Sequence, residues 1–254
     1  MNPKNLFSLV GRTALVTGSS RGIGAAIARG FAAHGARVVL HGQLAGATTT
    51  IEREIAEAGG VAVSIHGELS HLGAGRDLIA NAEAAAGPLD IVVVNASAQI
   101  NSEFGGVSDA DFQLQVEVNL RSTFEMMQAV LPSMAARGWG RVVNIGSINQ
   151  ARPKPIVAVY AATKAAQHNL MQSLARDYAK RGVLLNTLAP GLVDTDRNAG
   201  RRDADPEAWT NYVRNLNWMG RAADAEEMVG AALFLASDAC SFMTGETIIL
   251  SGGY

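Results

Sequence analysis

Arg12-Thr-Ala-Leu-Val-Thr17-Gly18-Ser-Ser-Arg21-Gly22-Ile-Gly24 is the pattern of a strand that enters a glycine turn. An alanine-rich stretch typical of a helix continues to His34. The glycines permit a tight turn and let backbone N–H groups approach a pyrophosphate, which the helix dipole then stabilises. The spacing is Gly-x-x-x-Gly-x-Gly rather than the commoner Gly-x-Gly-x-x-Gly, and a purely structural glycine turn is the alternative interpretation.

Apolar runs and helical patterns alternate along the rest of the chain. We predict strands at 12–17, 37–41, 61–66, 90–95, 141–145, 183–188 and 247–250. We predict the intervening helices at 48–58, 72–86, 109–137, 157–181 and 224–236. Such alternation predicts an α/β fold, a doubly wound seven-stranded parallel sheet with helices on both faces, Rossmann-like. The length of 254 residues and the even composition predict a single domain over 1–254.

The composition excludes several classes of protein. Hydrophobic residues make up 48% and charged residues 17% of the chain, and the net charge of −2 gives no electrostatic reason to bind nucleic acid. The pair Arg201-Arg202 fits a solvated loop. The first nine residues lack the apolar region of a secretory signal, and no window approaches a membrane span. With Cys240 as the single cysteine, these features predict a cytoplasmic protein without an internal disulfide.

Tyr160-Ala-Ala-Thr-Lys164 offers an acid and a cation at helical spacing. Residues four apart lie on the same helix face. A free phenol has a pKa of about 10, and a nearby ammonium favours its phenolate form, so Lys164 would make Tyr160 a usable acid. An ordinary surface pair is the alternative interpretation.

Two polar residues stand at unusual positions upstream of this pair. Ser147 ends a predicted strand 13 residues before Tyr160, where it is either a turn former or a hydrogen-bond partner for a substrate oxygen. Asn119 lies within an otherwise helical pattern, and Asn is unfavourable there because its side chain competes for backbone hydrogen bonds. We expect a local kink with a bound water at Asn119.

Taken together, the chain resembles the short-chain dehydrogenase/reductase family over nearly its whole length. The segment from Thr17 to Gly24 matches the family's cofactor motif. Its catalytic tetrad is matched in order and spacing by Asn119, Ser147, Tyr160 and Lys164. Further matches are Pro190-Gly191 followed by Thr195, and Thr244-Gly245-Glu246 with Gly252-Gly253.

The resemblance implies a role for each member of the tetrad. Tyr160 would be the acid in reduction or the base in oxidation, and Ser147 would hold the substrate oxygen. Lys164 would lower the Tyr160 pKa and bind the nicotinamide ribose. Asn119 would hold a water that relays protons between Lys164 and solvent. Hydride would pass between nicotinamide and substrate carbon.

The resemblance also implies the residues that contact the cofactor. Asn95 and Ala96 would lie near the adenine ribose, and Val193 and Thr195 near the carboxamide. The full set is Gly18, Ser20, Arg21, Gly22, Ile23, Gly24, His41, Glu68, Leu69, Asn95, Ala96, Tyr160, Lys164, Pro190, Gly191, Val193 and Thr195. Two positions depart from the family pattern: Ser97 replaces a usual glycine, and Glu68 replaces a usual aspartate that accepts from the adenine amino group.

The end of the second predicted strand bears on the choice of cofactor. It reads Leu40-His41-Gly42-Gln43, without the carboxylate that would bind a ribose 2′-hydroxyl and repel a 2′-phosphate. Arg21 stands where a guanidinium can bind that phosphate, and a protonated His41 would add a donor. These features favour NADP(H) over NAD(H). A solvent-facing Arg21 is the alternative interpretation.

The long irregular stretch at 192–221 is expected to be a substrate lid. The sequence leaves a 3-oxoacyl substrate and a sugar or sugar-acid substrate open, and Arg197, Arg201 and Arg202 in the lid suit either or are simply solvated. A dinucleotide-binding regulatory protein is the non-enzyme alternative, which the intact tetrad disfavours. The five histidines lack metal-ligand spacing, so no catalytic metal is predicted.

The predicted helices at 109–137 and 157–181 also bear on assembly. Relatives in the family usually pair these helices between subunits. Small and apolar residues along the second helix, Ala161, Ala165, Leu170 and Leu174, are expected to be exposed on faces away from the tetrad. The resemblance therefore implies a homotetramer or homodimer.

Overall fold

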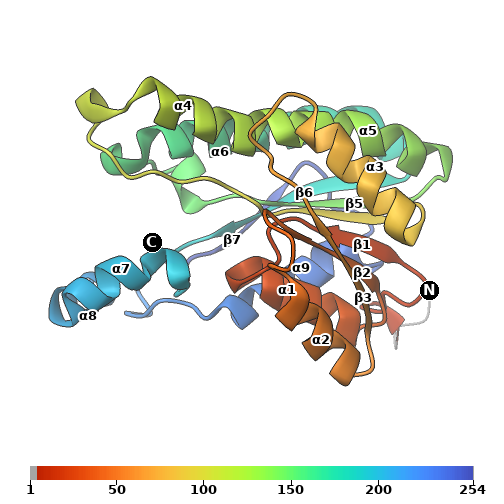
Figure 1. Ribbon diagram of the computed structural model, residues 1–254, viewed down its shortest axis with the longest axis horizontal. Helices are drawn as coiled ribbons and strands as arrows, with labels where there is room; N and C mark the ends of the chain where they lie inside the picture. The colour runs from red at the N-terminus through yellow and green to blue at the C-terminus, as the bar shows by residue number, and fades with distance from the viewer. Residues whose placement is uncertain (1–4, 254) are drawn as a thin grey trace.

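The computed structural model describes residues 5–253, so the ends of the expected domain, 1–4 and 254, lie outside the described residues. A parallel sheet of seven strands forms the centre, with helices covering both faces (Figure 1). The order of the strands is β3-β2-β1-β4-β5-β6-β7, so the chain starts in the middle and builds outward in both directions. The doubly wound α/β fold expected from the alternation of elements is confirmed.

The strands lie within one or two residues of their predicted bounds. They are β1 (Thr13–Val16), β2 (Arg37–Gly42), β3 (Val61–His66), β4 (Ile91–Val94), β5 (Gly140–Ile145), β6 (Val183–Pro190) and β7 (Thr247–Leu250). In the central register Leu15 pairs with Val39 on one side and Val92 on the other. These strands are buried on both faces, which explains why they read as continuous apolar runs.

Two apolar cores form, one on each face of the sheet. Alternate residues of a strand point to opposite faces, so Ala14 and Val16 enter one core and Leu15 enters the other. The first core is covered by α1 (Gly22–Ala33), α2 (Thr49–Glu57) and α9 (Val229–Ala236). The second is covered by α3 (Ala74–Ala86), α5 (Ser122–Ala136) and α6 (Ala158–Tyr178), with α4 (Asp109–Gln115) on the same side (Figure 1).

The predicted helix at 109–137 is interrupted. A π-helical segment, Val116–Arg121, lies between α4 and α5 and contains Asn119. The kink expected at Asn119 is therefore confirmed, because a π-helical turn widens the helix by one residue where it occurs.

The stretch at 192–221 is not irregular. It contains α7 (Asp196–Ala204) and α8 (Pro206–Arg214), which project from the carboxyl side of the sheet (Figure 1). Asp205 starts α8 by accepting a hydrogen bond from the Ala208 backbone N at 2.9 Å, and Pro206 follows at the first helical position. Sequence reasoning missed these helices because their apolar residues are few.

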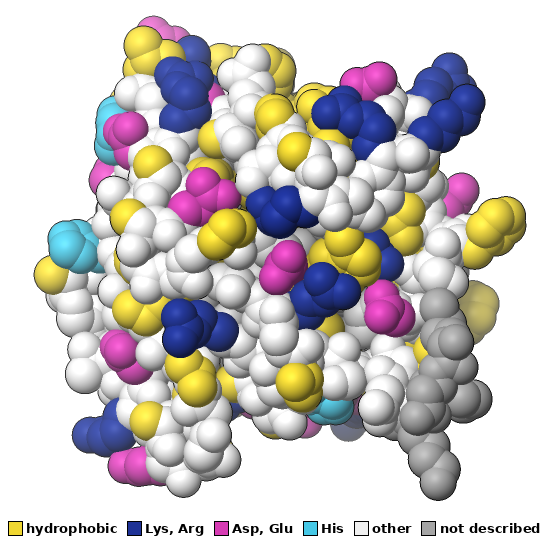
Figure 2. Space-filling view, turned by 90° about the vertical axis from the view of Figure 1, so that its right-hand side faces the viewer, with side chains coloured by type: hydrophobic (Ala, Val, Ile, Leu, Met, Phe, Trp, Pro, Cys, Tyr) yellow, Lys and Arg dark blue, Asp and Glu magenta, His cyan; other side chains and the backbone are white. Residues whose placement is uncertain are grey.

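Charges of both signs are mixed over the face seen in Figure 2, without a concentrated basic patch among the described residues there. None of the described helices is long and apolar enough to cross a membrane.

Candidate active site

The fold brings the four tetrad residues together at the carboxyl end of β5. Ser147 lies just beyond that strand, Tyr160 and Lys164 lie on α6, and Asn119 lies in the π-helical segment. Ser147 hydrogen-bonds to Tyr160, and Lys164 Nζ is 5.7 Å from the centroid of the Tyr160 ring. All four side chains are buried. The residues are therefore arranged as an acid–base site.

The Ser147 hydroxyl is held in place by a turn that begins at Ser147. Its Oγ accepts hydrogen bonds from the backbone N of Asn149 at 3.1 Å and from Asn149 Nδ2 at 3.2 Å. Gln150 Oε1 in return accepts from the Ser147 backbone N at 3.3 Å, which completes a capping box. Ser147 is thus the turn former that the sequence left as one alternative, and its role towards a substrate oxygen stays a prediction.

Tyr160 and Lys164 lie close together on α6, and burial shifts the pKa of both side chains. Burial raises the pKa of Tyr160, and the Arg197 charge with hydrogen bonds from Ser147 and Arg197 opposes that rise. Burial lowers the pKa of Lys164 to about 7, and its Nζ donates to the Ile145 carbonyl oxygen at 2.7 Å. The cation that favours the Tyr160 phenolate here is Arg197, because a deeply buried ammonium loses much of its own charge near neutral pH.

The Asn119 side chain is fully engaged with the neighbouring backbone. Its Oδ1 accepts from the Ala98 N at 2.8 Å, and its Nδ2 donates to the Ala98 carbonyl oxygen at 2.9 Å and to Thr163 Oγ1 at 3.0 Å. The Asn119 carbonyl oxygen accepts from Gln167 Nε2 and from Thr123 Oγ1, both at 2.6 Å. Asn119 therefore fixes the loop after β4 with both of its Nδ2 hydrogens and with Oδ1, and the water expected there stays a prediction.

The glycine turn between β1 and α1 has the conformation that its sequence predicts. Gly18 and Gly22 have φ angles of +63° and +55°, which residues with a side chain rarely adopt. A Cβ on Gly24 would lie 2.4 Å from the Gly18 carbonyl oxygen and 2.5 Å from Asn95 Nδ2. The turn is therefore too tight for a side chain at Gly24, and it leads directly into the α1 N-terminus, where backbone N–H groups can bind a phosphate.

Two polar residues stabilise this turn: Thr17, which follows β1, and Asn95, which follows β4. Asn95 Nδ2 donates to the carbonyl oxygens of Thr17 at 2.9 Å and Gly18 at 3.0 Å. Thr17 Oγ1 accepts from the backbone N of Asn95 and of Ala96, both at 2.9 Å, and donates to Val93 O at 3.2 Å. Sequence reasoning passed over Thr17 as a site residue, although a threonine directly before the first glycine was the available signal.

His41 does not fit the expected role of a phosphate donor. Its ring is 2% exposed, Nδ1 accepts from the Gly18 backbone N at 3.2 Å, and Nε2 lies 3.0 Å from the Gly67 carbonyl oxygen. Burial lowers the pKa of His41, despite the favourable bond to Gly67. A neutral ring with both nitrogens occupied supports the glycine turn instead.

A carboxylate does lie beside the end of β2, contrary to expectation. Gln43 Nε2 donates to Glu68 Oε2, and Glu68 Oε1 accepts from the backbone N of Leu69 at 2.8 Å and of Ser70 at 3.2 Å. Sequence reasoning considered β2 alone, whereas Glu68 follows β3. Three donors therefore already bind this carboxylate.

The remaining expected cofactor residues fall into two groups. Leu69 is buried in the core under α3, and Ile23 packs against the core under α1, so these two side chains face inward. Ser20, Arg21, Ala96, Pro190, Gly191, Val193 and Thr195 lie at the carboxyl ends of β1, β4 and β6. Thr195 packs against the glycine turn, because a Cβ on Gly22 would lie 3.3 Å from Thr195 Cγ2.

The α7–α8 segment rests on the loops around the tetrad. Arg197 Nη2 donates to Ser97 Oγ at 3.0 Å and to the Ser97 carbonyl oxygen at 3.1 Å, and Arg197 Nη1 donates to Gln99 Oε1 at 3.3 Å. From α8, Tyr212 Oη accepts from Lys154 Nζ at 2.9 Å. Lys154 lies in the loop that leads from Ser147 to Tyr160, so this segment reaches over the acid–base site.

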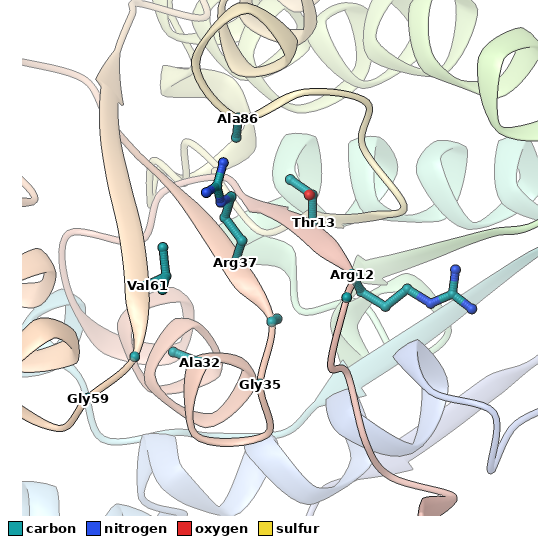
Figure 3. A pocket seen from close by; sticks show the side chains of 11 residues that line it. Arg12, Thr13, Ala32, Gly35, Arg37, Gly59, Val61 and Ala86 are labelled. Carbon is teal, nitrogen blue, oxygen red and sulfur yellow. The ribbon is translucent and has the colours of Figure 1, made fainter.

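One cavity lies away from this site. Its volume is about 350 Å³, and its lining includes Arg12, Thr13, Arg37 and Val61 at the amino ends of β1, β2 and β3 (Figure 3). Arg12 points away from the other lining residues in this view, towards Trp139, whose ring centroid is 3.5 Å from its guanidinium carbon. A second cavity of about 140 Å³ is lined by Ser147 and by Ala189, Ile249 and Ser251 at the ends of β6 and β7. Ligands of parallel sheets bind at the carboxyl ends, so the second cavity is the one that continues the active site.

Metal ligands are scarce in the described part of the chain. Residues 5–253 contain no group of three or more His, Cys, Asp or Glu side chains placed to hold a metal ion. The single thiol, Cys240, is buried, and its pKa is raised by burial.

A doubly wound parallel sheet, an open glycine turn and a buried tyrosine beside a lysine define a dinucleotide-binding α/β protein with an acid–base site. Comparison with known proteins extends this assignment. Residues 18–254 match the sequence profile described as Enoyl-(Acyl carrier protein) reductase. The gluconate 5-dehydrogenase of Gluconobacter oxydans (strain 621H) is 37% identical, over 100% of this chain and 98% of that protein. The chain belongs to the short-chain dehydrogenase/reductase family.

Two solved structures are also similar. A 3-oxoacyl (acyl-carrier-protein) reductase from Agrobacterium tumefaciens C58, with NADP bound, is 64% identical with a TM-score of 0.98, covering 100% of this chain and 98% of that one. A gluconate 5-dehydrogenase from Burkholderia cenocepacia J2315, in complex with NADP and tartrate, is 35% identical with a TM-score of 0.91, covering 99% and 98%.

Proposed function

We propose that this protein is an NADP(H)-dependent oxidoreductase that moves a hydride between nicotinamide and a carbonyl or secondary alcohol, with Tyr160 as the acid–base residue. The observation that carries the proposal is the buried Tyr160 hydroxyl, hydrogen-bonded to Ser147 beside an open glycine turn. A regulatory protein that only binds a dinucleotide would not need these side chains in contact. The intact tetrad therefore favours the enzyme.

The chain provides a fitting cradle for the dinucleotide. Gly18, Gly22 and Gly24 keep the space above the α1 N-terminus free of side chains, and a methyl group at Gly24 would collide with the turn itself. Backbone N–H groups at that N-terminus would hold the pyrophosphate. Thr195 and Val193 lie across the turn, where they would contact the nicotinamide end. When bound, the nicotinamide supplies or takes up the hydride.

The proton steps belong to the protein. In oxidation, Tyr160 takes the proton of the substrate hydroxyl as the hydride leaves the same carbon; in reduction it returns a proton to the oxygen. Ser147 holds that oxygen through its fixed hydroxyl. Arg197 favours the phenolate, which offsets the rise in the Tyr160 pKa that burial causes. Lys164, whose pKa is about 7, exchanges protons near neutral pH, and it would bind the nicotinamide ribose.

The preference for NADP(H) rests on Arg21 and on the relatives. Arg21 Nη1 is 3.7 Å from Asp196 Oδ2, and both side chains are largely exposed. Exposed ion pairs of this kind contribute little, about 0–1 kcal/mol, so Arg21 can turn to a 2′-phosphate at small cost. The two structural relatives described above were solved with NADP. His41 takes no part in this proposal, because both of its ring nitrogens bind backbone groups.

Exposed apolar side chains bear on the assembly of the protein, and its cysteine bears on its location. Ala161 is buried and Leu170 and Leu174 pack partly against the core, so the expected apolar face on α6 is mostly used within the subunit. The exposed apolar side chains Phe112, Leu114 and Phe124 lie instead on α4 and α5, and we infer that these helices pair two subunits in a homodimer or homotetramer. A single buried thiol suits the reducing cytoplasm.

The acid–base assignment is tested by replacing Tyr160 with phenylalanine. NADPH consumption with 2,3-butanedione as a neutral test substrate is expected to fall at least about 100-fold in Tyr160→Phe, because loss of general acid catalysis costs about 10²–10⁴-fold. NADPH binding, followed by fluorescence titration, should stay within about twofold of wild type. Tyr178→Phe, at the far end of α6, is the matched control and should retain turnover. Turnover of Tyr160→Phe within a few-fold of wild type would refute the assignment.

A further inference from the structure

Arg197 is a cation at the active site whose described partners are all uncharged. Its guanidinium donates to Ser97 and Gln99 and acts on Tyr160 through its charge and a hydrogen bond. Within residues 5–253, no carboxylate lies within ion-pair distance of Arg197, whereas its neighbour Arg202 pairs with Asp194 at 2.6 Å. A guanidinium has five N–H donors, more than these contacts use.

Ser97 holds the Arg197 guanidinium through two hydrogen bonds. The family pattern has glycine at position 97, and the serine here supplies both Oγ and the backbone oxygen to the same Arg197 nitrogen. The next residue, Ala98, is fixed to Asn119 by two hydrogen bonds of 2.8 and 2.9 Å. The guanidinium is therefore anchored to the frame that holds the tetrad, although Arg197 itself belongs to α7.

Two more cations, Lys154 and Arg201, contact Tyr212 of α8. Lys154 Nζ donates to Tyr212 Oη, and the Arg201 guanidinium carbon is 3.8 Å from the centroid of the Tyr212 ring. Partial burial would raise the pKa of Tyr212, but the hydrogen bonds and charges of Lys154 and Arg201 outweigh it and lower the pKa. Lys154 and Arg201 thus place two positive charges beside Tyr212.

An anion is the ligand that these groups fit. Arginine binds carboxylates through a planar, two-pronged set of donors, and such charge-assisted hydrogen bonds are roughly twice as strong as neutral ones. Arg197 also lies close enough to bond Tyr160, so the anionic group must sit within a few bonds of the reacting carbon. A 3-oxoacyl thioester is neutral around its reacting carbonyl, and its phosphate lies a whole pantetheine arm away.

We propose that Arg197, anchored by Ser97, binds a carboxylate of the substrate, and that the protein acts on a small hydroxy acid or the corresponding oxo acid. This inference rests on the proposed oxidoreductase function and specifies its substrate class. The carboxylate neutralises Arg197 and holds the neighbouring carbinol carbon against Ser147 and Tyr160. Oxidised nicotinamide, when bound, would accept the hydride from that carbon, while the hydroxyl proton passes to Tyr160.

The test compares two inhibitors that share a carbon skeleton. L-Tartrate is a hydroxy dicarboxylate, and L-threitol has CH₂OH in place of each carboxylate. Inhibition constants of both are measured against 2,3-butanedione reduction by NADPH, in wild type, Arg197→Gln, Arg197→Lys and the charge-matched control Arg53→Gln on α2. We expect tartrate to compete with the diketone and to bind at least about tenfold more weakly to Arg197→Gln, with Arg197→Lys intermediate and Arg53→Gln unchanged.

The outcomes separate this inference from the proposed function. The inhibition constant of threitol should differ less than about twofold between wild type and Arg197→Gln, and circular dichroism should show that the variant is folded. Equal tartrate inhibition in both proteins, or threitol inhibition as strong as tartrate inhibition in wild type, overturns the carboxylate site while leaving the oxidoreductase standing. No consumption of NADPH by wild type with butanedione or with any oxo acid in a panel overturns the function itself.

Discussion

The ammonium of Lys164 donates a 2.7 Å hydrogen bond to the backbone carbonyl oxygen of Ile145, the last residue of β5. Lys164 is only 1% exposed, so this one described bond must compensate for the loss of most of its hydration. Burial accordingly lowers its pKa from 10.5 to about 7. The bond links α6 to the end of β5, the strand that Ser147 follows.

Lys164 should make the free energy of unfolding depend on pH. The unfolded chain keeps the Lys164 proton up to pH 10.5, whereas the folded protein releases it from about pH 7. Between these values the unfolded state binds more protons, so the Lys164 contribution to stability rises with pH. Below pH 7 Lys164 is protonated in both states, so the full cost of burying its charge lowers the free energy of unfolding. We expect Lys164→Met to gain stability over wild type at pH 6 relative to pH 9, measured by urea unfolding. Lys180→Met, an exposed control, should show a constant difference, and a constant difference for Lys164→Met would contradict the prediction.

Gly24 should tolerate no side chain. A Cβ there would lie 2.4 Å from the Gly18 carbonyl oxygen and 2.5 Å from Asn95 Nδ2, and both belong to the braced turn. Overpacking of this kind typically costs about 1–3 kcal/mol. We expect Gly24→Ala to lose that much stability and to bind NADPH more weakly. In Gly230→Ala, where the new Cβ has no neighbour within 4 Å, stability should be unchanged or higher by up to about 1 kcal/mol. Equal effects of the two substitutions would speak against the braced turn.

Arg21 should discriminate between the two cofactors. Its exposed guanidinium is held by no more than the 3.7 Å contact with Asp196, so a 2′-phosphate can recruit it. We expect Arg21→Ala to reduce kcat/KM for NADPH at least about tenfold, the size of one charge-assisted hydrogen bond of roughly 1.5–3 kcal/mol. The value for NADH should change little, and Arg53→Ala should leave both values unchanged. A wild-type preference for NADH on one shared substrate would overturn the assignment of NADP(H).

The subunits should associate through α4 and α5. Phe124 and Phe112 are 47% and 50% exposed on adjoining parts of these helices. We expect light scattering at micromolar concentration to give two or four times 26.5 kDa, because the pairing would bury these side chains. Phe124→Asp should shift the mass towards one subunit, whereas Val10→Asp, at an apolar residue that is 76% exposed, should not. A wild-type mass of 26.5 kDa would refute the assembly.

The sequence by itself determined the order of elements, the glycine turn and the tetrad. The seven strands lie within two residues of their predicted bounds because their apolar runs are visible locally, and such a run is what the central strands β1 and β4, buried on both faces, require. The positive φ angles of Gly18 and Gly22 likewise belong to single residues. Tyr160 and Lys164 meet because both lie on one helix, where spacing alone sets which side chains are neighbours.

Only the tertiary structure decided what surrounds these residues. Arg197 reaches Ser97 across 100 residues of chain, and His41 binds Gly18 and Gly67, on either side of it in sequence. Burial of Lys164 under β5 weakened the charge that its spacing from Tyr160 had suggested. Contacts of this kind depend on which strand ends the sheet order places together, and a pKa depends on how much water the packed side chains leave around a group. Neither quantity is a property of neighbouring residues in the chain.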